Sequence, residues 1–195
     1  MIPHELCGMT AAEFRALSIR ARLAIVSACF LGWRYSMSVP RVPFRAGSIP
    51  RSMVEPAASV TNCSTLTAAV LMACYPEAPW TLREYGDLQV YADRLPSMPN
   101  APILAIERAG IGSRVDAPAA NAVHLVQGWR KMGPTAADFR GHAVIVATDA
   151  EPGRLRILEA TSKRMNLGPR WRESTLDDFR REFPAALYFG ALGAG

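Results

Sequence analysis

Apolar residues in the first part of the chain recur at the spacing of a helix. The segment Thr10-Ala-Ala-Glu13 precedes them and has the form of a capping box, in which the threonine hydroxyl and the glutamate carboxylate bind free amides at a helix start. The pattern predicts one helix over about residues 11–31 that ends near Gly32. The apolar positions that define it are Phe14, Leu17, Leu23, Val26 and Phe30.

A second helical pattern covers about residues 64–75 and is followed by Pro76. The preceding residues, 36–59, carry four prolines and Gly47. That is too much proline for a helix interior or a central strand. We therefore expect a long ordered loop at 36–59, and loops of this length are usually functional or flexible.

The middle of the chain gives mixed signals. The segment Thr81-Leu-Arg-Glu84 has the form of another capping box and predicts a short helix through Leu88. Residues 96–102 read as a loop because proline stands at both ends. The apolar runs at 103–107 and 123–129 are short; we expect a strand at the first, and either a strand or a helix at the second.

The last third has the pattern of a sheet. Residues 142–147 and 155–160 are β-prone runs on either side of Glu151-Pro152-Gly153, which is strong turn chemistry, so they predict paired strands. A short helix is expected to start near Ser174, and a final strand at 186–189.

Helices followed by an antiparallel sheet predict the α+β class, with N-terminal helices packed on a small sheet. A length of 195 residues favours one domain over residues 1–195. Half of the residues are hydrophobic, which is enough for a folded core.

Charge and motifs exclude several classes of function. The net charge of +5 is modest and the arginines are scattered, so we expect no specific nucleic-acid site. Phosphate-binding glycine motifs of the P-loop and dinucleotide kinds are absent from the sequence. Its four cysteines show no zinc-site spacing. We therefore expect neither a metal nor a cofactor, and at this size no disulfide framework.

The first residues, Met-Ile-Pro-His-Glu, lack the basic and then apolar layout of a secretory signal. The longest apolar stretch, residues 23–33, is shorter than the roughly 20 residues that span a bilayer. We expect no transmembrane segment, and a protein that is cytoplasmic or delivered by a non-standard route. The sequence leaves the oligomeric state open.

Cys63 is the strongest candidate nucleophile. In Thr61-Asn62-Cys63-Ser64 it falls at the first turn of the helix predicted at 64–75. The positive partial charge of a helix start favours the thiolate, which is the reactive form of cysteine. Taken alone, the residue would more simply be a small side chain at a helix start.

His142 is the candidate base because it heads the β-prone run at 142–147. A strand is a rigid platform for a catalytic side chain. His4 lies near the chain start and His124 lies in the ambiguous run at 123–129, so both compete poorly.

Glu159 is the candidate for a third residue that orients the imidazole of His142. A symmetric turn at Pro152-Gly153 would place it opposite Val146, roughly 13 Å along the strand from His142. A bulge or an asymmetric loop is needed to close that distance. Without one, the better orienting residues are Thr161, Ser162 and Asn166.

Several motifs, taken in order, resemble those of a known superfamily. Residues 23–35, which end in Gly32-Trp-Arg-Tyr35, resemble the helix and Gly-x-x-Tyr turn of NlpC-type cell-wall peptidases. Residues 44–47 resemble their aromatic–glycine step, and residues 61–66 their Asp-Cys-Ser-Gly-Leu nucleophile motif, with Asn62 and Thr65 in place of aspartate and glycine. Residues 141–146 and 157–160 resemble the histidine strand and the next strand, and the His-to-Glu order is similar to that of CHAP amidases.

The resemblance implies a papain-like fold and a cysteine peptidase or amidase acting on a bond of peptidoglycan stem peptides. In that hypothesis Cys63 is the nucleophile, His142 the base and Glu159 the orienting residue. Backbone amides at the helix start, together with Tyr35, Asn62 and Ser64, bind the substrate and the oxyanion.

Three alternatives remain open at this point. The same residues suit an acyltransferase that passes the acyl group to an amine or lipid. They also suit a protein-directed peptidase or deamidase, such as a toxin or a phage-borne factor. The third is a catalytically inert papain-like module for binding or assembly.

Overall fold

The computed structural model describes residues 8–35, 60–88, 99–131, 133–135, 139–151, 153–161 and 167–193. The proline-rich segment at 36–59 lies outside these ranges, as do His4, Pro152, Ser162 and Asn166.

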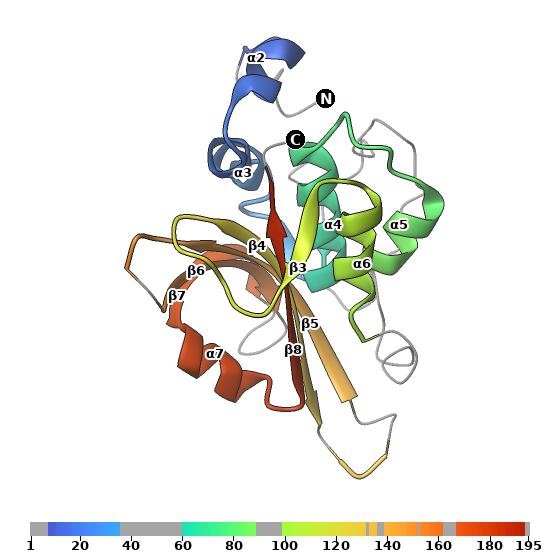
Figure 1. Cartoon of the computed structure of the whole chain (residues 1–195), viewed down its shortest axis with the longest axis vertical. Helices are drawn as coiled ribbons and strands as arrows, with labels where there is room; N and C mark the ends of the chain where they lie inside the picture. The colour runs from blue at the N-terminus through green and yellow to red at the C-terminus, as the bar shows by residue number, and fades with distance from the viewer. Residues whose placement is uncertain are drawn as a thin grey trace.

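A six-stranded antiparallel sheet forms the centre of the fold, in the order β3-β8-β4-β5-β6-β7 (Figure 1). Its strands are β3 (Gly112–Val115), β4 (Val123–Lys131), β5 (Phe139–Thr148), β6 (Arg154–Thr161), β7 (Leu167–Thr175) and β8 (Ala186–Leu192). A separate parallel pair joins β1 (Arg34–Tyr35) to β2 (Val60–Thr61).

Helices lie on both faces of this sheet (Figure 1). Most of them precede the sheet in the chain, and α7 follows β7. They are α2 (Ala11–Ala16), α3 (Ile19–Ala28), α4 (Cys63–Cys74), α5 (Leu82–Leu88), α6 (Ala101–Arg108) and α7 (Leu176–Glu182). The α+β class predicted from the sequence is therefore confirmed.

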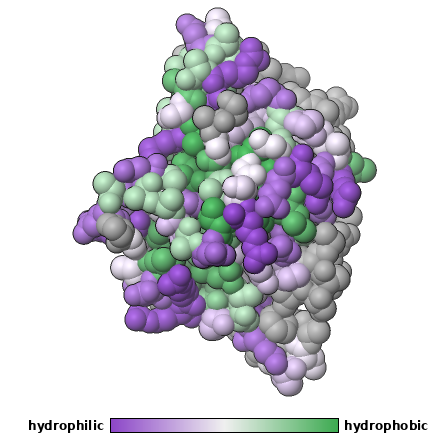
Figure 2. Space-filling model, in the orientation of Figure 1, coloured by the Kyte–Doolittle hydropathy of each residue, from purple (hydrophilic) through white to green (hydrophobic). Residues whose placement is uncertain are grey.

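The two faces of the sheet bury different residues because side chains alternate along each strand. On one face, Leu125 and Ile145 pack with the apolar residues of α3, α4 and α6. On the other, Val126, Val144 and Ile157 pack with Phe179 of α7. In Figure 2, hydrophilic and hydrophobic residues are mixed across the viewed surface, its centre included.

The predicted helix over 11–31 is two helices. Its capping box is confirmed, because Thr10 and Glu13 bind each other's backbone amides. Leu17 is extended, with ψ 148°, and the Ser18 side chain accepts a hydrogen bond from the amide of Ala21. A serine that caps a new helix in this way interrupts the pattern that apolar spacing alone suggests.

The other predicted elements differ in how well they match. The strand predicted at 103–107 is wrong, because these residues lie in α6, with a proline in its first turn. That helix also takes in the end of the loop expected at 96–102. Four predicted elements are confirmed: the helix at 64–75, the paired strands around residue 152, the helix after Ser174 and the final strand. The helix after Ser174 begins after its cap, Thr175. Of the two alternatives for residues 123–129, the strand is the one observed, since they lie in β4. The sequence pattern did not predict β7.

The Arg22 guanidinium ties α2, α3 and α4 together. Its side chain is 2% exposed and donates to the carbonyls of Leu17 (3.1 Å), Cys74 (2.9 Å) and Arg15, and to the carboxylate of Glu77 (3.1 Å). This network fixes the carboxyl end of α4 against the amino-terminal helices.

We expect Arg22→Met to lower the free energy of unfolding by about 3 kcal/mol, because it leaves buried carbonyls without donors. Urea unfolding followed by circular dichroism measures the change. Arg181→Met is the control: Arg181 pairs with Asp178 at 2.7 Å while 76% exposed, so its loss should cost less than about 1 kcal/mol. Equal losses in the two variants would contradict the structural role of Arg22.

Among the described residues, none of the helices combines the length and hydrophobicity needed to span a bilayer.

Candidate active site

Cys63 is the first residue of α4, and the residue before it caps the helix. The Oδ1 atom of Asn62 accepts hydrogen bonds from the amide of Thr65 (2.9 Å) and the hydroxyl of Ser64 (3.1 Å). Cys63 is half-buried and forms no disulfide. Its sulfur is thus fixed at the positive end of a 12-residue helix, as the sequence predicted.

The first turn of α4 lies against β5 where pairing between β5 and β6 ends. The last register pair of these strands is Ile145 with Leu158. Two residues further along β5, the carbonyl of Ala143 accepts from the hydroxyl of Thr67 (3.2 Å), which also donates to the carbonyl of Cys63 (2.8 Å). The amide of Ala143 also helps to lower the pKa of the Cys63 thiol. α4 therefore binds β5 just beyond the end of the β5–β6 pairing.

The structure brings His142 and Glu159 into contact, with Nε2 of the ring 2.9 Å from Oε2 of the carboxylate. The register expected from a symmetric turn is wrong by two residues, because Val146 pairs with Ile157. Continued along the strands, this register sets Glu159 beside Val144. Its side chain is then on the same face as His142 and diagonal to it, within reach of a long side chain.

Of the alternative orienting residues, Thr161 pairs with Leu167 on β7 beyond a register shift. Ser162 and Asn166 lie outside the described residues. Glu159 is thus the candidate whose contact with the imidazole the structure describes.

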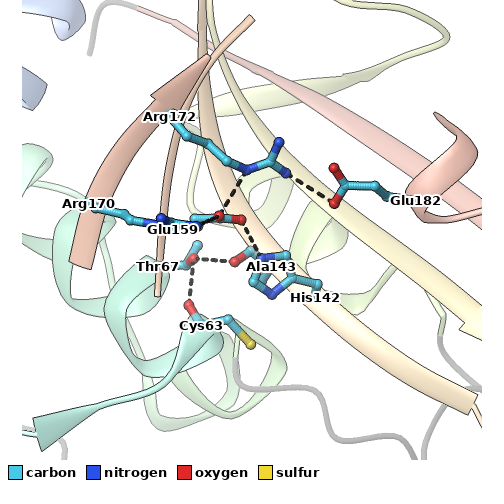
Figure 3. A network of polar contacts seen from close by, with 8 residues as sticks. All are labelled: Cys63, Thr67, His142, Ala143, Glu159, Arg170, Arg172 and Glu182. Carbon is cyan, nitrogen blue, oxygen red and sulfur yellow. Dashed lines mark hydrogen bonds and ion pairs between the residues drawn. The ribbon is translucent and has the colours of Figure 1, made fainter. Parts of the chain in front are cut away.

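Cys63 and Glu159 lie on opposite sides of the imidazole (Figure 3). Because Glu159 holds Nε2, Nδ1 is the ring nitrogen left to face the thiol. His142 and Cys63 are close enough that each shifts the pKa of the other. The imidazole thus lies between the thiol at the start of α4 and the carboxylate on β6.

The contacts shift the three pKa values in directions that favour charge separation. Burial opposes ionisation of each group. For Cys63, the hydrogen bond and charge of His142, with the amides of Ala143 and Ser64, outweigh burial and lower the thiol pKa. For His142, its contacts with Cys63 and Glu159 raise the pKa to about 9. The pKa of Glu159 falls to about 2 through His142 and Arg172. Both shifts favour the thiolate–imidazolium form of the pair.

Arginines from β7 surround the Glu159 carboxylate on its other side. Arg172 donates from Nε at 2.8 Å and Arg170 from a terminal nitrogen at 3.4 Å, both to Oε1. Sequence reasoning missed these residues. The signal was the alternation in Arg170-Trp171-Arg172, since residues two apart on a strand share a face.

The three predicted oxyanion or substrate residues have different surroundings. Tyr35 is half-buried and pairs with Thr61, so the β1–β2 contact brings it near the residues just before Cys63. In the cap, the hydroxyl of Ser64 donates a hydrogen bond to Oδ1 of Asn62. The amide of Cys63 belongs to the first turn of α4, where amides have no acceptor within the helix, and it is a candidate oxyanion donor.

We expect Glu159→Gln to slow alkylation of Cys63 by iodoacetamide about tenfold or more near pH 6, since a hydrogen bond to a charged group is worth about 1.5–3 kcal/mol. The glutamine keeps the shape but removes the charge that raises the pKa of His142, so less imidazolium remains to stabilise the thiolate. Glu173→Gln, an exposed change on β7, is the control. Unchanged kinetics in Glu159→Gln would show that Glu159 has no part in activating the thiol.

Within the described ranges, no cluster of three or more His, Cys, Asp or Glu side chains is arranged to hold a metal ion. Comparison of the chain with protein-family models, curated proteins and solved structures finds no match.

Proposed function

We propose that the chain is a cysteine hydrolase that cleaves amide bonds through Cys63, His142 and Glu159. The observation that carries the proposal is the placement of these residues. The thiol lies at the start of α4, α4 binds β5 next to His142, and Nε2 of the imidazole is 2.9 Å from Oε2 of Glu159. A nucleophile, a base within hydrogen-bond reach and a third group that orients the base are the parts that covalent catalysis requires.

The geometry supports the following steps. The Cys63 thiolate attacks the carbonyl carbon, and the electron pair of the C=O bond moves to oxygen, where the amide of Cys63 stabilises the charge. As the C–N bond breaks, the His142 imidazolium gives its proton to the leaving nitrogen, and a thioester remains on Cys63. The neutral imidazole then takes a proton from water, whose oxygen attacks the carbonyl carbon of the thioester. The C–S bond breaks with its electron pair going to sulfur, which releases the acid and restores the thiolate and the imidazolium.

Glu159 supports both steps without reacting itself. Its carboxylate holds Nε2 of the ring, so Nδ1 stays directed at the thiol in either protonation state. Its pKa of about 2 means that it remains negatively charged throughout the working pH range and stabilises the imidazolium.

The proposed substrate is an amide bond of a peptidoglycan stem peptide, and the proposed fold is the papain-like one of NlpC-type peptidases. The motif resemblance around Tyr35, Cys63 and His142 supports this. The arrangement agrees with it: the cysteine starts a helix, and the histidine and glutamate follow on adjacent antiparallel strands. Because a fold hosts many functions, the substrate class rests on analogy.

Incubation with defined muropeptides, with and without the sugar, and mass spectrometry of the products test the proposal. We expect cleavage at one amide bond by the wild type and none by Cys63→Ala. Added hydroxylamine should yield a hydroxamate, since it intercepts a thioester. Hydroxamate formed without any hydrolysis in water would favour acyl transfer. A wild-type protein that cleaves no muropeptide contradicts the proposed substrate, and one whose Cys63 is also unreactive contradicts the enzyme.

A further inference from the structure

The ring of Phe183, just after α7, covers one side of the His142 imidazole. The two rings are stacked, with centroids 5.7 Å apart and an interplanar angle of 15°. Gly128 of β4 pairs with His142, and a Cβ atom there would lie 2.5 Å from Cγ of Phe183. The glycine thus leaves the space in which Phe183 packs beside the imidazole.

Arg172 makes a second connection from this part of the fold to the site. It bridges the carboxylates of Glu159 (2.8 Å) and Glu182 (3.2 Å), the latter at the end of α7 (Figure 3). Its guanidinium also lies over the ring of Phe179, 5.7 Å from the centroid, and Phe179 packs on Phe183 at 5.1 Å.

We propose that Arg172 and Phe183 are positioning residues for the Cys63–His142 pair. Phe183 restricts rotation of the imidazole by covering one of its faces. Arg172 holds the Glu159 carboxylate in the orientation that binds Nε2. Arg172 binds Glu159 and Phe183 stacks on His142, so both act on the thiol through these neighbours. The inference rests on the proposed function for the role of the pair.

Ion pairs with two carboxylates fix the orientation of the Arg172 side chain. Glu159 is 4% exposed and accepts from Arg172, Arg170 and His142. Arg172 itself is 20% exposed and divides its donors between two carboxylates. The guanidinium of Arg172 binds the Glu159 carboxylate through Nε and the Glu182 carboxylate through a terminal nitrogen. Lysine and methionine lack this fork of donors and cannot hold the two carboxylates in the same geometry.

Phe183→Leu tests the inference without changing any charge. We expect the rate of iodoacetamide alkylation at Cys63 near pH 6 to fall about tenfold, since small losses of alignment are costly in reactive pairs. Phe189→Leu is the matched control: Phe189 is also 4% exposed and lies in the same core cluster, but it pairs with Val126, away from His142. Thermal unfolding of both variants measures their losses of stability.

Arg172→Met gives a second test and Arg156→Met its control. Arg156 also lies over an aromatic ring, 5.4 Å from the centroid of Trp171, but on the opposite face of β6 from Glu159. We expect Arg172→Met to lower the rate near pH 6 by about tenfold and to leave the rate above about pH 10 near that of wild type, where the free thiolate reacts without the imidazolium. Arg156→Met should match wild type throughout.

The outcomes separate the two proposals. Suppose that wild-type Cys63 is reactive near pH 6 and that each test variant, Phe183→Leu or Arg172→Met, is alkylated as fast as its control. The positioning role is then overturned and the proposed function stands. If wild-type Cys63 reacts no faster than an ordinary thiol, the proposed function fails and the positioning role fails with it. Loss of low-pH reactivity only in Phe183→Leu and Arg172→Met supports the inference.

Discussion

Cys63→Ala should reduce amide hydrolysis by ~10⁴-fold or more, because the residue that forms the covalent intermediate cannot be replaced by a neighbour. The described residues contain two other cysteines, and neither lies at the site. Cys74 is buried and Cys29 is at the end of α3. Product formation from the cleaved muropeptide, measured over a long incubation, gives the residual rate.

Cys29→Ala is the control for Cys63→Ala. It makes the same chemical change at another half-buried cysteine, so it should keep wild-type activity. Activity that survives in Cys63→Ala, or that is lost equally in Cys29→Ala, would mean that another residue is the nucleophile.

His142→Ala should remove the low-pH reactivity of Cys63. In the wild type, the contacts with His142 offset burial and lower the thiol pKa below 9.0. Without the imidazolium, burial is the largest remaining influence and the pKa rises. At a pH below the pKa of Cys63, each unit by which that pKa rises leaves about tenfold less thiolate. We therefore expect the rate of alkylation near pH 6 to fall about a hundredfold.

The high-pH limb of the same profile controls for misfolding. Above about pH 10 the thiol ionises with less help, so the rates of the variant and the wild type should approach one another. Cys63 labelling that ignores the loss of His142 at every pH would favour an inert binding module over an enzyme.

Cys63 and His142 were predictable because their signals are local. A polar cap before an apolar helical stripe marks Cys63, and a β-prone run marks the strand of His142. Glu159 was predictable as a residue type but not in register. The turn decides the register, and the two-residue error left the face unchanged because strand side chains alternate with a period of two.

The supporting residues Gly128, Arg172 and Phe183 were not predicted because their roles depend on contacts distant in sequence. β7 contains glycine, proline and several charges, and it becomes a strand by pairing with β6. The 103–107 run failed for another reason. A short apolar run fits a strand or a buried helix equally, and a proline beside it suits the first turn of a helix.

Titration of the His142 imidazole by nitrogen NMR, in wild type and in Cys63→Ala, tests the thiolate–imidazolium pair most directly. In the wild type we expect an imidazolium that persists until about pH 9. In Cys63→Ala the pKa should be clearly lower, because the charge and hydrogen bond of the thiolate are gone. A neutral His142 at pH 7 in the wild type, or the same titration in both proteins, would contradict the account.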